Sequence, residues 1–327
     1  MNNVQSNRKK ILAIVAPAYN ESAGLDEFYS RFISSTKGLD LELEVIYVND
    51  GSQDDTLELM CKQRSNDPRI TIIDLSRNFG KEIALTAGLD HALGDAVVVI
   101  DTDLQDPPEL IPALVDKWLD GNDVVNAKRL KRKGESWFKK MTSYMYYRFL
   151  YQLSDIKIPK DTGDFRLLSR DALDASLKLR EKHRYMKGLF AWVGYSQVEI
   201  TYERDERYAG DTKWSFWGLV NLAFEGLTSF SVLPLRLASM VGVLSAFIAL
   251  VFGSLIIIKK FLNGDPVAGY ASLVVLITFI GGIQLLALGV IGEYLGRVFN
   301  ETKNRPLYLV KDIQKSRYLA NQKDNKS

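Results

Sequence analysis

The most informative stretch of this sequence is Ala96-Val97-Val98-Val99-Ile100-Asp101-Thr102-Asp103-Leu104-Gln105-Asp106-Pro107-Pro108. Its first five residues are apolar and four of them are β-branched, which is typical of a strand buried on both faces. Carboxylates and an amide follow the strand directly, and the two prolines favour the start of a helix. Open α/β sheets bind ligands at the carboxyl ends of such strands, so we expect a binding site here.

The polar residues of this stretch have the chemistry of a metal site. Asp101, Asp103 and Gln105 occupy every second position, so in an extended chain they share one face. Their hard oxygen atoms suit Mg²⁺ or Mn²⁺, ions that usually bind through one or two carboxylates and the phosphates of a substrate. A solvated acidic loop is the simpler interpretation of such a cluster. The buried strand before it favours a site for a metal and a nucleotide.

Short apolar segments alternate with helical patterns in the first part of the chain. The expected strands cover residues 11–16, 43–48, 70–75, 96–100 and 123–127. The expected helices cover residues 25–36, 54–65 and 109–120, with a further helix that ends at 93. This alternation predicts an α/β fold with a parallel, right-handed, doubly wound sheet. An alternating segment at 197–202 is expected to be an edge strand.

Each of the first five expected strands ends in polar residues, and the carboxyl ends of parallel strands meet at one rim. These residues are Tyr19-Asn20-Glu21, Asp50-Gly51-Ser52, Arg77-Asn78, Asp101-Thr102-Asp103 and Lys128-Arg129. The sequence has no G-x-G-x-x-G motif after its first strand and no P-loop motif. A metal and basic side chains would therefore have to hold a diphosphate in this crevice.

The composition argues against several classes of protein. A net charge of +2 gives no case for nucleic-acid binding. The single cysteine, Cys61, excludes an internal disulfide and a cysteine-based zinc site. Because the chain has only two histidines, we do not expect a metal site built from several of them.

Two long uncharged segments lie near the C-terminus. Leu237–Ile258 has 22 residues without a charge, and Pro266–Gly292 has 27. Both exceed the roughly 20 residues that span a bilayer, so we expect a two-helix transmembrane hairpin. Basic residues in 297–317 place the tail in the cytoplasm by the positive-inside rule, and the N-terminal domain with it. Lys259 and Lys260 in the connector weigh weakly against that orientation.

The chain therefore divides into four expected parts. These are a cytoplasmic α/β domain (1–213), amphipathic helices at the membrane interface (214–231), two transmembrane helices (232–296) and a basic cytoplasmic tail (297–327). The small residues of Ala238-x-x-x-Gly242 and Gly292-x-x-x-Gly296 allow helices to approach closely. Packing within the hairpin explains these motifs, and so does a homo-oligomer, either a dimer or a tetramer.

Two further segments have two interpretations each. Thr162-Gly163-Asp164-Phe165-Arg166-Leu167 is either a turn or a segment that places the carboxylate of Asp164 against the crevice. The charged segment Arg204–Lys213 is either a mobile lid over the crevice or a linker to the membrane part.

Taken together, these motifs resemble glycosyltransferase family 2, in particular the polyprenyl-phosphate glycosyltransferases. The motifs are Pro17-Ala18-Tyr19-Asn20-Glu21, Asn49-Asp50-Gly51-Ser52, Ser76-Arg77-Asn78-Phe79-Gly80-Lys81-Glu82, residues 101–109, Gly163-Asp164-Phe165-Arg166-Leu167 and Arg207-x-x-Gly210-x-Thr212-Lys213. The chain is similar to the bactoprenol glucosyltransferases of O-antigen (lipopolysaccharide) modification and, more distantly, to dolichyl-phosphate mannose synthases. The resemblance covers nearly the whole chain, including the two-helix tail. Thr212 replaces the family's usual Ser and Ala16 its usual Val, which puts none of the polar positions in doubt.

The resemblance implies a GT-A catalytic domain, with a doubly wound and mostly parallel sheet, at the cytoplasmic face of a bacterial inner membrane. The donor would be a UDP-sugar, with glucose first among several sugars, and the acceptor a polyprenyl phosphate such as undecaprenyl phosphate. Transfer would invert the anomeric carbon and depend on Mg²⁺ or Mn²⁺. Two alternatives stay open, a processive family 2 polysaccharide synthase and a non-catalytic membrane protein that binds nucleotide sugars. The chain lacks the Q-x-x-R-W motif that such synthases usually carry.

The resemblance also assigns roles to residues. Pro17, Tyr19, Glu21, Val48 and Asp50 would hold the nucleoside, Lys81 would contact the donor, Asp101 and Thr102 would lie against the nucleotide, and Asp103 with Gln105 would bind the metal. Arg129, Arg207 and Lys213 would bind the phosphates. The catalytic residues would be Asp103, Arg129 and Asp164, and Asp164 would act as a base or position a substrate.

Overall fold

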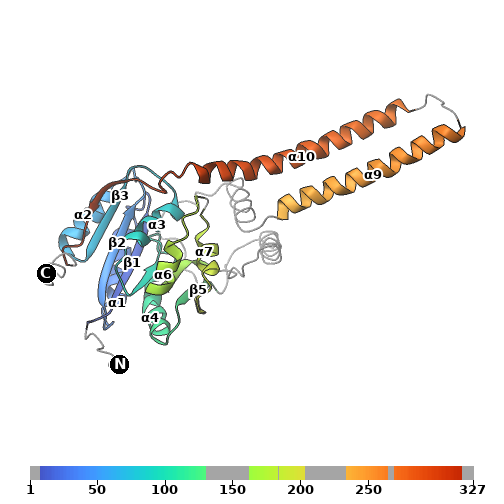
Figure 1. Cartoon of the computed structure of the whole chain (residues 1–327). Coiled ribbons are helices and arrows are strands. Elements are labelled where there is room, and N and C mark those ends of the chain that lie inside the picture. The colour runs from blue at the N-terminus through green and yellow to red at the C-terminus, as the bar shows by residue number, and fades with distance from the viewer. Residues whose placement is uncertain (1–7, 130–161, 183, 203–232, 264–268, 319–327) are drawn as a thin grey trace.

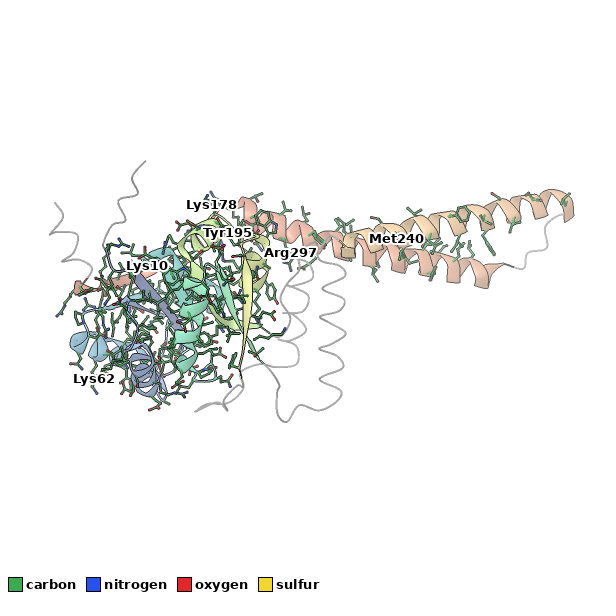
Figure 2. The ribbon with its side chains drawn as sticks, turned by 90° about the horizontal axis from the view of Figure 1, so that it is seen from below. Lys10, Lys62, Lys178, Tyr195, Met240 and Arg297 are labelled. Atoms are coloured by element: carbon green, nitrogen blue, oxygen red, sulfur yellow. The ribbon has the colours of Figure 1, made fainter. Side chains whose placement is uncertain are left out.

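The structure is a computed structural model, which describes residues 8–129, 162–182, 184–202, 233–263 and 269–318. An α/β domain contains the N-terminal part of the chain, and two long helices project from it side by side (Figure 1). Figure 2 shows the same division from a second direction, with Lys10, Lys62 and Lys178 in the domain and Met240 on the projecting pair.

Within the described residues, the centre of the domain is an eight-stranded sheet. Its strands are β1 (Ile11–Ala18), β2 (Glu42–Asn49), β3 (Ile70–Leu75), β4 (Ala96–Val99), β5 (Val124–Arg129), β6 (Thr162–Ser169), β7 (Gln197–Tyr202) and β8 (Val310–Gln314). The spatial order is β7-β5-β6-β4-β1-β2-β3-β8. The pairs β1–β2, β1–β4, β2–β3 and β5–β7 are parallel, whereas β6 and β8 run antiparallel to their neighbours.

Helices cover both faces of the sheet and bury its apolar side chains. They are α1 (Leu25–Thr36), α2 (Thr56–Asn66), α3 (Lys81–His91), the short η1 (Pro108–Leu110), α4 (Ile111–Leu119), α6 (Arg170–Leu177) and α7 (Met186–Trp192). One core contains residues of α1, α2 and α4, and the other contains residues of α3, α6 and α7. The strands β1 to β4 are buried on both faces, because each lies between these two layers.

The expected α/β class with a doubly wound, mostly parallel sheet is confirmed, and the strands that run antiparallel to their neighbours are β6 and β8. Of the two interpretations of the segment at 162–167, the turn is wrong, because the segment belongs to β6, which inserts between β4 and β5. Alternation along the sequence does not reveal this insertion, because β6 pairs with β4, a strand more than 60 positions earlier in the chain. The expected edge strand at 197–202 is confirmed as β7, which ends the sheet on one side.

The expected tail contains a strand that the sequence pattern did not predict. β8 pairs antiparallel with β3 and forms the other edge of the sheet. The strand has only five residues, and two of them, Lys311 and Asp312, are charged. A segment this short shows no clear alternation of apolar and polar residues, which is the sequence signal for a strand. The chain that leaves the long helices therefore returns to the α/β domain.

The projecting pair consists of α9 (Leu233–Asn263) and α10 (Tyr270–Thr302). The two helices pack against each other, and their connection at 264–268 lies outside the described residues. Within the described part of the chain, one segment, Phe279–Thr302, is long and apolar enough to cross a membrane. The expected span at 266–292 shares residues 279–292 with this segment, and α10 continues unbroken past Gly292 to Thr302. The interfacial helices expected at 214–231 lie outside the described residues.

Candidate active site

The loops that follow β2 and β3 are bound to each other at the carboxyl edge of the sheet. Asp50 accepts hydrogen bonds from the backbone amides of Phe79 at 2.7 Å and Gly80 at 3.0 Å. Burial raises the pKa of Asp50, and these two amides oppose that rise. Gly51 has a φ of +67°, and a Cβ atom there would lie 2.5 Å from the backbone of Arg77. Only glycine therefore allows the two loops to come this close.

The loop after β1 is held by the start of α2. Asn20 has a positive φ of 53°, and its side-chain oxygen accepts a hydrogen bond from the amide of Gln53 at 2.8 Å. The amide of Glu21 donates to Thr56 Oγ1 at 2.9 Å. These bonds fix the backbone beside Tyr19 and Glu21, two of the expected nucleoside contacts, before any ligand is present.

The loop after β4 keeps the predicted alternation but not the predicted extended backbone. Asp101, Asp103 and Gln105 are partly exposed, whereas the residues between them are buried. Leu104 has a positive φ of 60° and is 1% exposed, so the chain turns sharply while its side chain stays in the core. Such a conformation is strained for a branched residue and is typical of functional loops.

The insertion of β6 brings Asp164 to this rim. In the antiparallel register of β4 and β6, Val99 lies opposite Arg166. Continuing this register by two residues places Asp101 opposite Asp164. Lys81, the first residue of α3, lies between them, with its Nζ 2.6 Å from Asp101 and 2.5 Å from Asp164. One ammonium group thus forms ion pairs with two opposed carboxylates.

The charges of this trio depend strongly on one another. Burial would lower the pKa of Lys81, but the two carboxylates outweigh it and raise that pKa. Burial raises the pKa of Asp101 to about 6 despite the nearby ammonium group. Burial acts in the same direction on Asp164, but Lys81 and Lys187 together lower the pKa of Asp164. Near neutral pH, Lys81 is therefore charged and Asp164 is ionised.

A second group of ionisable residues surrounds the trio. Glu82 accepts a hydrogen bond from the amide of Met186 at 3.1 Å, and burial beside Asp164 raises the pKa of Glu82 to about 7. Arg166 is 2% exposed, donates to the carbonyl of Gly163 at 2.8 Å and lies over the ring of Phe190. Glu82 and Arg166 therefore place further charges near Lys81, Asp101 and Asp164. In these low-dielectric surroundings, charges interact more strongly than they do in water.

The edge strand β7 is connected to the same rim. Tyr202, its last residue, donates a hydrogen bond to the buried carboxylate of Asp106. The ring of Tyr202 also packs edge-on against Phe165, with 6.3 Å between the ring centres. The turn after β4 is therefore supported from the side by both β6 and β7.

Within the described residues, no group of three or more His, Cys, Asp or Glu side chains could hold a metal ion. The donor set fits an ion that takes only part of its ligands from the protein. Asp103 and Gln105 are partly exposed residues with oxygen ligands, and Asp103 Oδ1 accepts a hydrogen bond from the backbone amide of Gln105 at 3.1 Å. Asp101, in contrast, is already paired with Lys81. Mg²⁺ and Mn²⁺ accept such incomplete sites when substrate phosphates supply further oxygen atoms.

The other residues expected to bind the nucleotide sugar lie in different surroundings. Tyr19 and Glu21 lie at the rim and are partly exposed, and Thr102 is buried with its hydroxyl 3.5 Å from the carbonyl of Pro17. Val48 is fully buried beneath α3, so its side chain lies in the core and not on the surface of the crevice. The backbone of Arg129 ends β5, but its side chain, like Arg207 and Lys213, lies outside what the structure describes.

Sequence reasoning missed Glu82, Lys187 and the role of Arg166. Glu82 and Arg166 belonged to motifs already quoted, and their position beside polar strand ends was the available signal. Lys187 lies in α7, an unremarkable helix in sequence. Only the packing of α7 against α6 and the start of α3 brings it near Asp164.

Comparison with known proteins gives a consistent result. The family description "Glycosyl transferase family 2" matches residues 13–177. An uncharacterized glycosyltransferase of Synechocystis sp. is 49% identical over 96% of this chain and 99% of its own. The prophage bactoprenol glucosyl transferase homolog of Escherichia coli is 43% identical over 93% of this chain and 99% of its own. Mannosyl-3-phosphoglycerate synthase from Rubrobacter xylanophilus, a solved structure, aligns with a TM-score of 0.45 at 17% identity, over 66% of this chain and 71% of its own.

The protein is a glycosyltransferase, and the chain belongs to glycosyltransferase family 2. The resemblance stated from the motifs is confirmed by the family match and by these relatives. They support glycosyl transfer to a lipid carrier as the reaction.

Proposed function

We propose that this enzyme transfers a sugar, glucose by similarity, from a UDP-sugar to undecaprenyl phosphate or a related polyprenyl phosphate. The observation that carries this proposal is the match to a relative named bactoprenol glucosyl transferase homolog. That match covers 304 residues, so it includes most of α9 and α10 as well as the catalytic domain. A relative that shared only the catalytic domain would say nothing about a lipid acceptor.

A lipid acceptor requires the crevice to lie close to a membrane. Many apolar side chains of α9 and α10 face outward, among them Phe247 at 64% exposed and Leu285 at 71%. Apolar surface of this extent is unfavourable in water and favourable in lipid. We therefore place both helices across a bacterial inner membrane, with the catalytic domain and β8 on the cytoplasmic side.

Asp103 and Gln105 would hold Mg²⁺ or Mn²⁺ together with the donor diphosphate. When bound, the metal supplies charge neutralisation as the nucleoside diphosphate leaves. Lys81 keeps Asp101 and Asp164 in fixed positions beside that site through its two ion pairs. Arg129, Arg207 and Lys213 would add positive charge around the leaving group.

The acceptor phosphate is already anionic near neutral pH, so the enzyme needs no strong general base. The Oδ1 atom of Asp164 is buried and has no hydrogen-bond partner among the described residues, so it is available for a contact with a substrate. This oxygen can accept a hydrogen bond from a sugar hydroxyl. Asp164 therefore positions the sugar for in-line displacement, which inverts the anomeric carbon.

The test uses membranes that contain the protein, undecaprenyl phosphate, Mg²⁺ and a panel of labelled nucleotide sugars. Label that passes into organic solvent from one donor identifies both the reaction and the sugar. Asp103→Asn should reduce this label by about 10²–10³-fold, whereas the exposed Asp116→Asn on α4 should leave it unchanged. Lipid label that stays at the wild-type level in Asp103→Asn would contradict the assignment of the metal site. A long polymer as the product would instead indicate a processive synthase.

A further inference from the structure

The connection between α10 and the catalytic domain carries polar contacts that the proposed chemistry does not use. Glu301, in the last turn of α10, accepts a hydrogen bond from the backbone amide of Lys182 at 2.6 Å. The ammonium group of Lys182 donates to the backbone carbonyl of Arg305, just beyond the helix. The loop between α6 and α7 is therefore bound to α10 at the point where that helix ends.

A second set of contacts follows a few residues later. The hydroxyl of Tyr308 donates to Asp90 Oδ2 at 2.8 Å. Arg180 binds the same carboxylate through both terminal nitrogens, at 2.7 Å and 3.1 Å. Burial and the bond to Asp90 raise the pKa of Tyr308, so its hydroxyl remains a donor. We call Asp90, Arg180, Lys182, Glu301 and Tyr308 the α10 junction.

The α10 junction is continuous with the candidate active site. Asp90 lies in the last turn of α3, whose first residues are Lys81 and Glu82. Because a helix rises about 1.5 Å per residue, Lys81 and Asp90 are about 14 Å apart along α3. The chain beyond Arg180 leads to Met186, whose amide binds Glu82. Two elements thus link the end of α10 directly to the rim.

The chain beyond the α10 junction is also fixed. The amide of Ser76 donates to the carbonyl of Leu309 at 2.9 Å, and β8 then pairs with β3. The segment after α10 is therefore anchored on both sides, to α3 by Tyr308 and to the sheet by β8. A connection of this kind transmits the orientation of the helix to the domain.

We propose that the α10 junction holds the catalytic domain at one height and tilt over the membrane, so that the rim meets the phosphate of a membrane-embedded acceptor. This inference rests on the proposed function, since it needs a lipid acceptor. A phosphate confined to the bilayer surface cannot follow a tilting domain, and small misplacements of reacting groups reduce rates strongly. A short acceptor dissolved in water can approach the rim at any tilt. The junction residues are thus positioning residues for the lipid acceptor.

The same fold contains a matched control for these contacts. Tyr29 donates to Asp67 Oδ2 at 2.7 Å, and Arg69 binds that carboxylate at 2.7 Å. This second Tyr-Asp-Arg group joins α1 to the loop between α2 and β3, entirely within the catalytic domain. Tyr29→Phe and Tyr308→Phe therefore remove equivalent hydrogen bonds, but only Tyr308→Phe changes the link to α10.

The experiment compares two acceptors with UDP-glucose as donor. One is undecaprenyl phosphate in vesicles of phosphatidylethanolamine and phosphatidylglycerol, and the other is a two-isoprene prenyl phosphate in solution. Loss of a hydrogen bond to a charged group changes an equilibrium constant about tenfold. We therefore expect Tyr308→Phe to raise the KM for the vesicle acceptor about tenfold. The KM for UDP-glucose and for the soluble acceptor should not change. Tyr29→Phe should change none of the three.

A second measurement reports on orientation without turnover. Spin labels at Lys178 and Met240, in a Cys61→Ser background diluted with unlabelled protein, should give a narrow distance distribution that broadens in Tyr308→Phe only. An unchanged distribution, or equal KM changes for both acceptors, would overturn the role of the α10 junction. A wild-type protein that transfers glucose to neither acceptor would overturn the proposed function itself, and the acceptor role with it.

Discussion

Charged residues have opposite roles at the two ends of the parallel strands of the central sheet. We call the end where these strands begin the amino edge and the end where they finish the carboxyl edge. At the amino edge, each carboxylate completes a local contact. Asp95 accepts a hydrogen bond from the amide of Ile11 at 2.7 Å and pairs with Arg8, and Asp67 is neutralised by Arg69. At the carboxyl edge, two carboxylates oppose each other across β4 and β6 and share a single ammonium group.

The backbone shows a related contrast. In the loops before the parallel strands, the described residues with positive φ are the glycines Gly121 and Gly194, whereas the loops at the carboxyl edge also contain two non-glycine residues with positive φ, Asn20 and Leu104. Strain of this kind persists where the surrounding structure enforces it, and it is concentrated at functional sites. The amino edge thus stabilises the fold, whereas the carboxyl edge retains strain and opposed charge for binding and catalysis. Substitutions at the two edges should therefore separate activity from stability.

The largest effect is expected for Asp103. Asp103→Ala removes the carboxylate that would bind the metal, so kcat should fall by about 10²–10³-fold, the loss typical of a missing electrostatic contact in the transition state. Asp95→Asn, at the other edge, weakens contacts to Ile11 and Arg8, so it should lower the melting temperature but leave kcat within about twofold. Transfer of labelled sugar to lipid measures both. Equal losses in the two variants would remove the distinction between the edges.

The second-largest loss of activity is expected for a substitution of Lys81. Lys81→Met keeps the aliphatic stem but leaves Asp101 and Asp164 opposed without a cation, so we expect kcat to fall by about 10²-fold. Lys81→Arg keeps the charge and should recover part of the activity. Steady-state kinetics at pH 7.5 compares the two variants. Full activity in Lys81→Met would show that the ion pairs are dispensable.

Gly51 tests the contribution of the strained loops. In Gly51→Ala the new Cβ atom meets the backbone of Arg77, so the contact between the loops must open and the affinity for UDP should fall about tenfold, the equivalent of 1.4 kcal/mol. Gly121 has a similar positive φ of 97° but open space around it. Gly121→Ala should therefore reduce stability without reducing affinity, and titration calorimetry with UDP can verify this. Equal affinities in both variants would contradict the need for close loop contact.

Glu82 gives a smaller effect that depends on pH. Its pKa is raised from 4.5 to about 7, so the folded protein disfavours the charged form. Stability is therefore lost as the pH rises from below 4.5 through 7. Glu82→Gln should melt higher than wild type at pH 8, by about 2–4 °C if the gain is about 1 kcal/mol. The difference should vanish at pH 4. Melting curves at the two pH values test this, and a gain that is equal at both would contradict the raised pKa.

Asp67 should have the smallest effect on turnover. Its pKa is lowered by Arg69 and Tyr29 although burial acts in the opposite direction. A lowered pKa contributes stability that is present above 3.8 and is lost as the pH falls through the folded value. Asp67→Asn should therefore reduce the melting temperature at pH 7 more than at pH 3, with kcat unchanged. A loss of activity would mean that the amino edge also serves catalysis.

The sequence alone predicted most of the first half of the fold. The helix at 25–36 and the strand at 70–75 were predicted with the bounds that the structure has. Buried apolar runs and helical periodicity are local signals, because each reflects what one segment must bury. The identity of the polar residues at the rim followed from the same reasoning, since each buried apolar run ends where a group of polar residues begins.

The tertiary structure alone decided how those groups meet. Asp164 lies opposite Asp101 because β6 inserts antiparallel beside β4, and Lys81 lies between them because α3 packs on the same side. The return of the chain as β8, and with it the α10 junction, also depends on a strand pairing between residues more than 200 positions apart. Pairing of distant strands is a property of the whole chain, so no local pattern of residues encodes it.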